Sequence, residues 1–208
     1  MNWLISFEGI DGSGKTTLVE GLRQNLANSI VTREPRGTKL GLEVWRLVND
    51  KQTVSNIWTQ FLLFLASHNE HVKTVIEPNL AQGKIVLVDR YLDSTFVYQG
   101  IYGNLGVKKL NDVLHNTVNS PFPHLTFILD IDPAQAQMRL HKRQEDSGEW
   151  NEWDALKLEI HQKIREGYLA LKEYFPARKI YIINSQQEPK KILQEVLLII
   201  RQQLGIFR

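Results

Sequence analysis

The sequence of 208 residues is long enough for one domain with a sizeable hydrophobic core. Its composition, 42% hydrophobic and 23% charged, is ordinary for a globular protein, and a formal net charge of +2 does not favour a nucleic-acid-binding surface. The absence of cysteine excludes disulfides and thiolate metal sites, and it favours a reducing cytoplasm. The N-terminus lacks a basic region followed by a long apolar run, and the apolar run at residues 196–200 is too short to cross a bilayer. We therefore expect a cytoplasmic protein without a signal peptide or membrane span, with a single domain over residues 1–208.

The first predicted strand, residues 4–7, runs directly into a glycine-rich segment. Residues 9–16 fit the pattern G-x-x-x-x-G-K-[ST], and leucines at four-residue steps from Leu18 predict a helix behind them. In this setting glycines let backbone N–H groups surround phosphate oxygens, and the helix N-terminus adds positive potential. We predict a P-loop that binds ATP, in which Lys15 reaches the β- and γ-phosphates and the Thr16 hydroxyl ligates Mg²⁺. The predicted ATP-binding residues are Gly9, Ile10, Asp11, Gly12, Ser13, Gly14, Lys15, Thr16 and Thr17.

Two further strands end in charged residues. The second, residues 30–32, is followed by Arg33 and stopped by Pro35. Residues 39–82 have a helical pattern, with Ser55 as a candidate N-cap. The third strand, residues 85–88, leads into Asp89, Arg90 and Tyr91. Since open α/β sheets bind ligands at the carboxyl ends of their strands, both segments are candidate parts of a site.

The last two strands, residues 125–129 and 180–183, each precede a helical stretch, at 134–143 and 189–204. Five β-rich runs with helical crossovers predict a P-loop NTPase-type three-layer α/β/α fold with a five-stranded parallel sheet. Residues 144–154 break the pattern, because they are polar and contain Gly148 and two tryptophans. They are interpreted either as a solvated loop or as part of a short lid insert at about 139–154.

The motifs together resemble those of the thymidylate kinase family. The P-loop, the segment Thr32-Arg33-Glu34-Pro35-Arg36-Gly37-Thr38, the triplet at 89–91 and the Tyr98-Gln99-Gly100 segment occur in the family's order, and the resemblance runs from Trp3 to about residue 200. It implies a nucleoside monophosphate kinase that phosphorylates dTMP with ATP and Mg²⁺. It also suggests a homodimer formed through helices in the 40–80 and 93–118 regions.

The resemblance also implies an acceptor site. Phe64 would stack on thymine, Arg33 and Arg90 would hold the 5′-phosphate, and Asp11 would lie near the sugar 3′-hydroxyl and the metal. Asp89 would support the metal together with Thr16. The remaining implied acceptor residues are His68, Ser94, Thr95, Tyr98 and Gln99, with Tyr98 under the deoxyribose. From the residues alone, Phe64 fits the core better than a ligand site, and Tyr98 fits either equally well. Arg90 could simply pair with Asp89, although a charged pair at the end of an apolar strand favours a functional role.

Two departures from the family pattern concern the acceptor site. Arg36 stands where the family usually has a glycine, so it either strains a backbone with positive φ or turns its charge toward the phosphates. His68 stands where the family has an arginine that hydrogen-bonds a thymine carbonyl. A ring N–H of His68 could replace that bond, or His68 could be structural.

A third departure concerns the lid. The family's D-R-x-E pattern appears as Asn-Glu-Trp-Asp at residues 151–154, without the arginine, and Gly12 stands where some relatives carry an arginine in the P-loop. Arg139 and Arg143, four residues apart on one helical face, resemble the lid arginines of bacterial members and are predicted to meet the transition-state charge. The alternative is an exposed basic helix end.

Two rival functions remain. One is a kinase for another pyrimidine nucleotide such as dUMP, or for a nucleoside, although Arg33 and Arg90 favour a phosphorylated acceptor. The other is a P-loop switch that binds GTP. Such a switch needs an N-K-x-D or T-K-x-D segment, and residues 38–41, Thr-Lys-Leu-Gly, lack the aspartate. We predict a thymidylate kinase that binds ATP and dTMP and has neither a nucleic-acid nor a membrane partner.

Overall fold

The computed structural model describes residues 2–50, 52–118, 120–148 and 157–205. Five parallel strands form one sheet in the order β2-β3-β1-β4-β5. The strands are β1 (Trp3–Glu8), β2 (Ser29–Arg33), β3 (Ile85–Asp89), β4 (Leu125–Asp130) and β5 (Ile180–Asn184). All five predicted strands are confirmed, each one or two residues longer than its predicted core.

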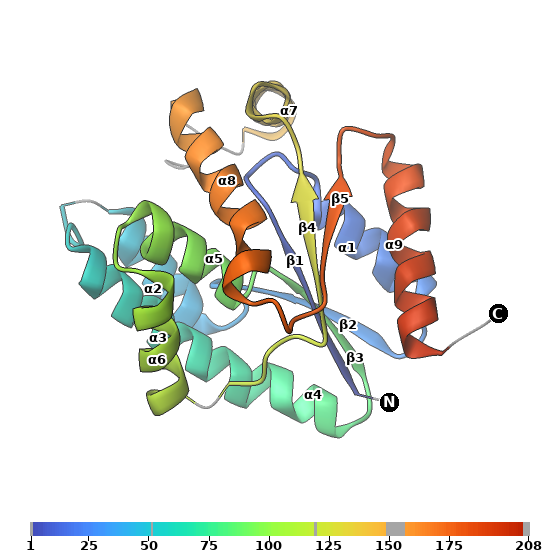
Figure 1. Cartoon of the computed structure of the whole chain (residues 1–208), viewed down its shortest axis with the longest axis horizontal. Helices are drawn as coiled ribbons and strands as arrows, with labels where there is room; N and C mark the ends of the chain where they lie inside the picture. The colour runs from blue at the N-terminus through green and yellow to red at the C-terminus, as the bar shows by residue number, and fades with distance from the viewer. Residues whose placement is uncertain (1, 51, 119, 149–156, 206–208) are drawn as a thin grey trace.

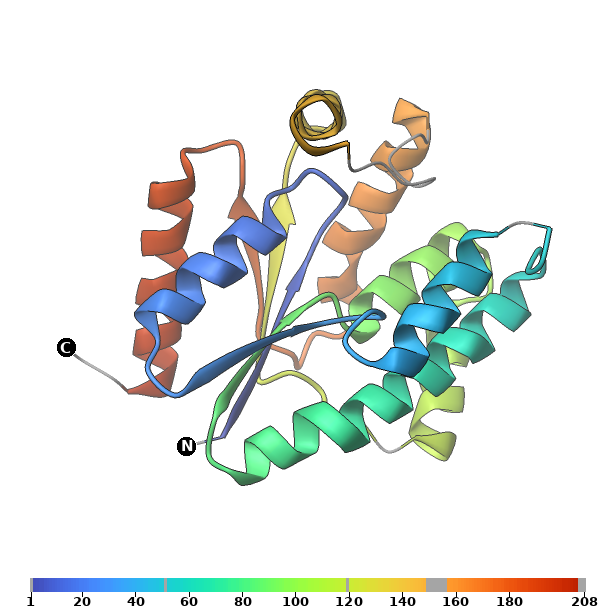
Figure 2. The same cartoon turned by 180° about the vertical axis from the view of Figure 1, so that it is seen from behind.

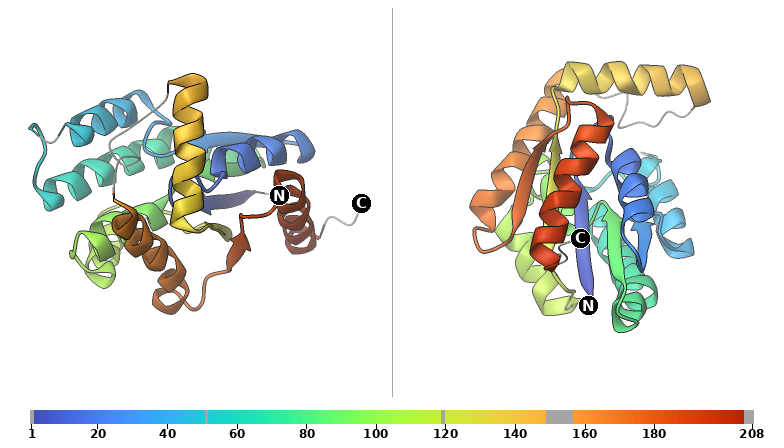
Figure 3. Two further views of the ribbon diagram at one scale, coloured as in Figure 1. Left: turned by 90° about the horizontal axis from the view of Figure 1, so that it is seen from above. Right: turned by 90° about the vertical axis from the view of Figure 1, so that its right-hand side faces the viewer.

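Helices cover both faces of the sheet (Figures 1 and 2). On one face lie α1 (Lys15–Asn25) and α9 (Pro189–Leu204), and on the other lie the helices between β2 and β4 together with α8 (Leu158–Tyr174). Helix α7 (Pro133–Ser147) crosses the end of the sheet toward which the strands point (Figure 3). The elements between β2 and β4 are α2 (Lys39–Asn49), α3 (Ile57–His71), η1 (Val72–Ile76), α4 (Glu77–Ala81), α5 (Leu92–Thr95), η2 (Phe96–Tyr102) and α6 (Val107–Thr117).

The continuous apolar runs in the strands explain the two-sided core. Successive side chains of a strand point to opposite faces, so Val86 packs with the helices between β2 and β4, while Leu87 packs with α1 and α9. The same alternation holds for Leu4 and Ile5 in β1. A strand covered on both faces needs an apolar residue at nearly every position. The three-layer fold predicted from the sequence is therefore confirmed.

Several helix boundaries differ from the prediction. The N-cap in the middle of residues 39–82 is Asn56, not Ser55, because the Asn56 side chain accepts hydrogen bonds from the backbone N–H groups of Trp58 and Thr59. Helix α7 continues through residues 144–147, the start of the segment interpreted from the sequence as a loop or a lid, and ends at Gly148 in the left-handed conformation. The rest of the predicted lid, including residues 151–154, lies outside the described residues. No helix within the described part of the chain has the length and hydropathy needed to cross a membrane.

Candidate active site

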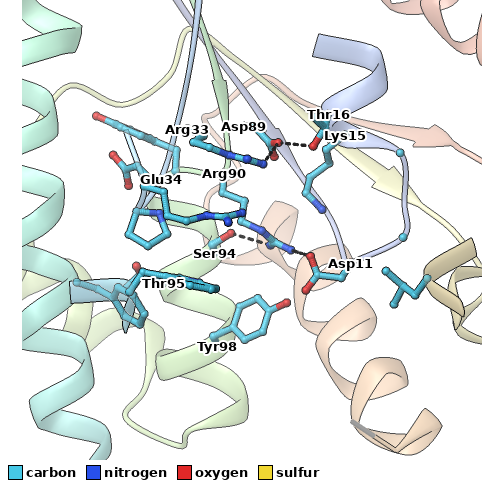
Figure 4. A pocket seen from close by; sticks show the side chains of 18 of the residues that line it. Asp11, Lys15, Thr16, Arg33, Glu34, Asp89, Arg90, Ser94, Thr95 and Tyr98 are labelled. Carbon is cyan, nitrogen blue, oxygen red and sulfur yellow. Dashed lines mark hydrogen bonds and ion pairs between the residues drawn. The ribbon is translucent and has the colours of Figure 1, made fainter. Parts of the chain in front are cut away.

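A cavity of about 620 Å³ lies at the carboxyl ends of the strands, between the P-loop, α3, α5 and α7. It brings together most of the residues predicted for the site (Figure 4). The predicted residues that line it are Asp11, Gly12, Gly14, Lys15, Thr16, Thr17, Arg33, Phe64, Asp89, Arg90, Ser94, Thr95, Tyr98, Gln99, Arg139 and Arg143. Gly9, Ile10, Ser13 and His68 are predicted residues outside this lining.

The P-loop glycines allow close backbone packing. Gly9 and Gly12 have φ of 135° and 79°, and a Cβ at either position would lie 2.6 Å or less from a backbone oxygen, of Leu129 or Ala136 respectively. A larger residue would therefore push the loop off the end of the sheet and off α7. Between these glycines and α1 the loop forms the concave backbone that a phosphate requires.

Lys15 is folded back onto the P-loop. Its Nζ donates to the carbonyl oxygens of Gly9 at 3.0 Å and Ile10 at 2.9 Å. Burial, together with the charge of Arg90, lowers the pKa of Lys15 to about 8. A phosphate group in the loop would supply the negative charge that this buried ammonium group needs.

Thr16, Asp89 and Arg33 meet beside the loop. The Thr16 hydroxyl donates to Asp89 Oδ2 at 2.8 Å, and Arg33 Nη2 donates to the same oxygen at 3.1 Å. Among the described residues, no cluster of three or more His, Cys, Asp or Glu side chains could hold a metal by itself. The two oxygens suit Mg²⁺ as it is bound with a nucleotide, where phosphate oxygens and water supply most of the ligands.

Arg90 lies at the centre of the cavity with its backbone in the left-handed region, at φ 67°. Its Nη2 donates to Asp11 Oδ1 at 2.7 Å, and its Cζ lies 5.6 Å from the centroid of the Tyr98 ring. Burial alone would raise the pKa of Asp11, but the charges of Arg90 and Lys15 lower it below its ordinary value. Arg90 pairs with Asp11 rather than with its neighbour Asp89.

Two residues that the sequence did not predict for the site, Glu8 and Tyr168, lie next to Arg90 and Ser94. Glu8 is fully buried and accepts hydrogen bonds from the Tyr91 N–H and the Ser94 hydroxyl, both at 2.7 Å. Burial and the charge of Asp93 raise the pKa of Glu8 to about 8, although the Ser94 bond and the Arg90 charge oppose the rise. Glu8 directly precedes the P-loop motif at residues 9–16, a position that could have identified it. Tyr168, 78 positions from Arg90 in the chain, carries no such local signal.

Arg36 does not take the strained conformation considered from the sequence. The described non-glycine residues with positive φ are Asn28, Arg90 and Asn104, and Arg36 is not among them. Its guanidinium lies 4.9 Å from the centroid of the Trp45 ring, and both residues line the cavity. Arginine at this position therefore costs no backbone strain.

His68 is turned away from the cavity. Its Nδ1 lies 2.9 Å from Glu34 Oε1, and its Nε2 lies 2.8 Å from Ser120 Oγ. The same Glu34 oxygen lies 2.8 Å from His71 Nδ1. Burial would raise the pKa of Glu34, but His68 and His71 lower it to about 2. Since both ring nitrogens of His68 have protein partners, the structure does not support its predicted hydrogen bond to the base.

Replacing His68 by Ala is expected to destabilise the fold and to leave base selectivity unchanged. The change removes one of the two histidines that bind Glu34, and it should lower the free energy of unfolding by about 1–3 kcal/mol. Thermal melting measures the first effect. The ratio of kcat/KM for dTMP to that for dCMP measures the second. His115→Ala, at an exposed position of α6, is the matched control. A changed ratio with unchanged melting would instead assign His68 to the base.

Arg139 and Arg143 lie along α7 at the P-loop side of the cavity. Arg139 donates to the carbonyl oxygens of Gly12 at 3.4 Å and Ser185 at 2.9 Å. Arg143 also lines the cavity, and its charge contributes to the low pKa of Asp11. Both predicted lid arginines therefore line the site, Arg139 from an exposed position and Arg143 from a half-buried one.

Comparisons with a family model, with related sequences and with a solved structure all identify the same family. The thymidylate kinase family model matches residues 7–196. A thymidylate kinase of Thermoanaerobacter sp. (strain X514) is 38% identical over 204 residues, covering 96% of this chain and 98% of the relative. One from Limosilactobacillus fermentum is 35% identical, covering 92% of this chain and 91% of the relative. The crystal structure of thymidylate kinase from Ehrlichia chaffeensis superposes with a TM-score of 0.75 at 30% identity, covering 95% and 98% of the two chains. The chain belongs to the thymidylate kinase family.

Proposed function

We propose that this protein transfers the γ-phosphoryl group of ATP to the 5′-phosphate of dTMP, giving dTDP and ADP. Family membership makes it a nucleoside monophosphate kinase. The cavity is the observation that best supports dTMP as the acceptor. It is lined by the P-loop lysine Lys15, by Arg90 as the candidate for phosphate binding, and by the aromatic ring of Phe64. A nucleotide whose phosphate meets Arg90 and whose base meets Phe64 would point its phosphate at the P-loop.

Catalysis in this proposal is positioning and charge neutralisation. An oxygen of the acceptor phosphate forms a bond to the γ-phosphorus while the bond between that phosphorus and the β,γ-bridging oxygen breaks, and ADP leaves with the electron pair. The acceptor oxygen is already anionic, so no general base is needed. Lys15 would neutralise charge on the β- and γ-phosphates, while Arg33 and Arg90 would align the acceptor in line with the breaking bond. Arg139 and Arg143 would stabilise the transferring group from α7.

Thr16 and Asp89 would hold Mg²⁺ together with ATP phosphate oxygens. Bound there, the ion would neutralise charge that develops on the phosphates. Arg33 shares the Asp89 oxygen with Thr16, so metal binding and the placement of Arg33 would depend on the same carboxylate. The proposed base pocket consists of Phe64 and Thr95, with Tyr98 and Gln99 at the sugar, and it does not include His68.

We also propose a cytoplasmic homodimer. The proposal rests on the family resemblance, and it is supported by large apolar side chains that are exposed on α2 and α3, among them Leu47 and Leu62 at 43% and 54% exposure. Light scattering of the protein in solution should give twice the mass of one chain. A monomer at micromolar concentration would exclude the dimer and would leave the proposed reaction untouched.

Product analysis tests the reaction. Incubation with ATP, dTMP and Mg²⁺, followed by ion-exchange chromatography, should give dTDP and ADP in equal amounts. Chelation of the metal should stop the reaction. Formation of ADP and inorganic phosphate without dTDP would mean that the site hydrolyses ATP and does not use dTMP as an acceptor.

A further inference from the structure

Hydrogen bonds to Asp11, Ser94 and Tyr168 hold the guanidinium plane of Arg90. Nη2 donates to Asp11, and Nη1 donates to the Tyr168 hydroxyl at 2.8 Å and to the Ser94 hydroxyl at 3.2 Å. Figure 4 shows the bonds to Asp11 and Ser94. These partners come from the P-loop, α5 and α8, which are far apart in the chain. In the described ranges of the chain, the Tyr168 bond is the hydrogen bond that links Arg90 to α8.

The directions of the hydroxyl protons follow from the chemistry of arginine. A guanidinium group only donates, so the oxygens of Tyr168 and Ser94 both accept from Arg90. The Tyr168 proton then has Ser94 Oγ as its acceptor, at 2.9 Å. The Ser94 proton is left for Glu8 Oε2, at 2.7 Å. Both hydroxyl dipoles therefore point their oxygens at Arg90 and their protons toward Glu8.

Helix α8 is held by two contacts in the turn just before Tyr168. Arg165, one turn before Tyr168, makes two hydrogen bonds to the Asp130 carboxylate, at 2.6 and 2.9 Å. Gly167 lets the helix lie close to η2, because a Cβ there would be 3.0 Å from Val97 Cγ1. Tyr168 itself is 1% exposed. Its hydroxyl is thus fixed by the packing of α8 against β4 and η2.

Tyr168 does not belong to the cavity lining within the described part of the chain. It therefore acts on a bound acceptor only through Arg90 and Ser94. We propose that Tyr168 is a positioning residue, whose hydroxyl holds the Arg90 guanidinium in the orientation that receives the acceptor 5′-phosphate. This inference rests on the proposed function, because it presumes that Arg90 binds the phosphate of dTMP.

Tyr168→Phe tests the inference, because it removes the hydroxyl and keeps the ring. KM for dTMP should rise about tenfold, as expected when one hydrogen bond to a charged group is lost. KM for ATP should stay within about twofold, since the hydrogen bonds of the Tyr168 hydroxyl within the described residues go to Arg90 and Ser94, not to the P-loop. Tyr174→Phe, on the same helix and 51% exposed, is the matched control and should change neither value.

A double-mutant cycle distinguishes positioning from a general structural role. If Tyr168 acts through Arg90, Tyr168→Phe should have almost no effect on dTMP affinity in an Arg90→Ala background. An equal loss of dTMP affinity in both backgrounds, or an equal rise of both KM values, would overturn the inference. If wild type makes no dTDP, the proposed function fails instead.

Gly167→Ala provides a second variant if Tyr168→Phe does not fold. The added methyl group would lie 3.0 Å from Val97 Cγ1, and Val97 is fully buried with little room to move. We therefore expect α8, and the Tyr168 hydroxyl with it, to shift by a few tenths of an ångström. KM for dTMP should then rise at least about threefold, with KM for ATP unchanged. An unchanged KM for dTMP in a folded Gly167→Ala protein would count against the positioning role.

Discussion

Replacing Lys15 by Ala is expected to lower kcat by about 10²–10³-fold or more. The expectation follows from the role of a preorganised charge, because one lost contact to the transition state commonly has this effect. Lys15 is held by the carbonyl oxygens of Gly9 and Ile10, so its ammonium group lies at the centre of the phosphate-binding loop. The fold should survive the change, since burial already disfavours the charge and lowers the pKa of Lys15 to about 8.

A coupled assay that follows ADP formation measures this effect, with thermal melting as the check on folding. Lys190→Ala, at an exposed position of α9 remote from the cavity, is the matched control and should behave as wild type. Turnover of the Lys15→Ala protein near the wild-type rate would remove the P-loop from the mechanism, whatever its backbone geometry.

Replacing Arg90 by Ala is expected to weaken dTMP binding by about 1.5–3 kcal/mol while leaving ATP binding nearly unchanged. The guanidinium forms charge-assisted hydrogen bonds, and its neighbours Asp11, Ser94 and Tyr168 hold it in place before the acceptor arrives. Titration calorimetry with each nucleotide measures the two affinities separately.

Arg23→Ala is the control for Arg90→Ala, because Arg23 lies on the surface of α1 with a side chain 60% exposed. It should change neither affinity. Equal losses for ATP and dTMP in the Arg90→Ala protein would give Arg90 a general structural role, as the partner that keeps the Asp11 carboxylate ionised in a buried site.

The sheet and the strand ends could be predicted because their signals are local. Residues 85–88 are short, β-rich and apolar at every position, as expected for a strand covered on both faces. The charged residues after this strand are then expected at the carboxyl edge of the sheet. The P-loop has a local pattern as well. The strand ends and the P-loop could therefore be predicted from short stretches of sequence, and the cavity lies where these stretches meet in the fold.

His68 could not be placed from spacing. Residues three and four positions after Phe64 both lie near its face of α3, and it is Ser67 that lines the cavity. The orientation of His68 depends on the Glu34 carboxylate, which the fold brings to it from another element. Tyr168 was missed for a related reason, since α8 was not predicted and its contact with Arg90 exists only in the folded chain.

The comparison of dTMP with thymidine as acceptors tests the central claim most directly. The account places Arg33 and Arg90 at the acceptor phosphate, and thymidine has the same base and sugar without that phosphate. A coupled assay with ATP and Mg²⁺ should give a kcat/KM for dTMP at least about 10²-fold above that for thymidine, as the loss of a charge-assisted contact predicts. Comparable values for the two acceptors would contradict the account, because these arginines would then bind no acceptor phosphate.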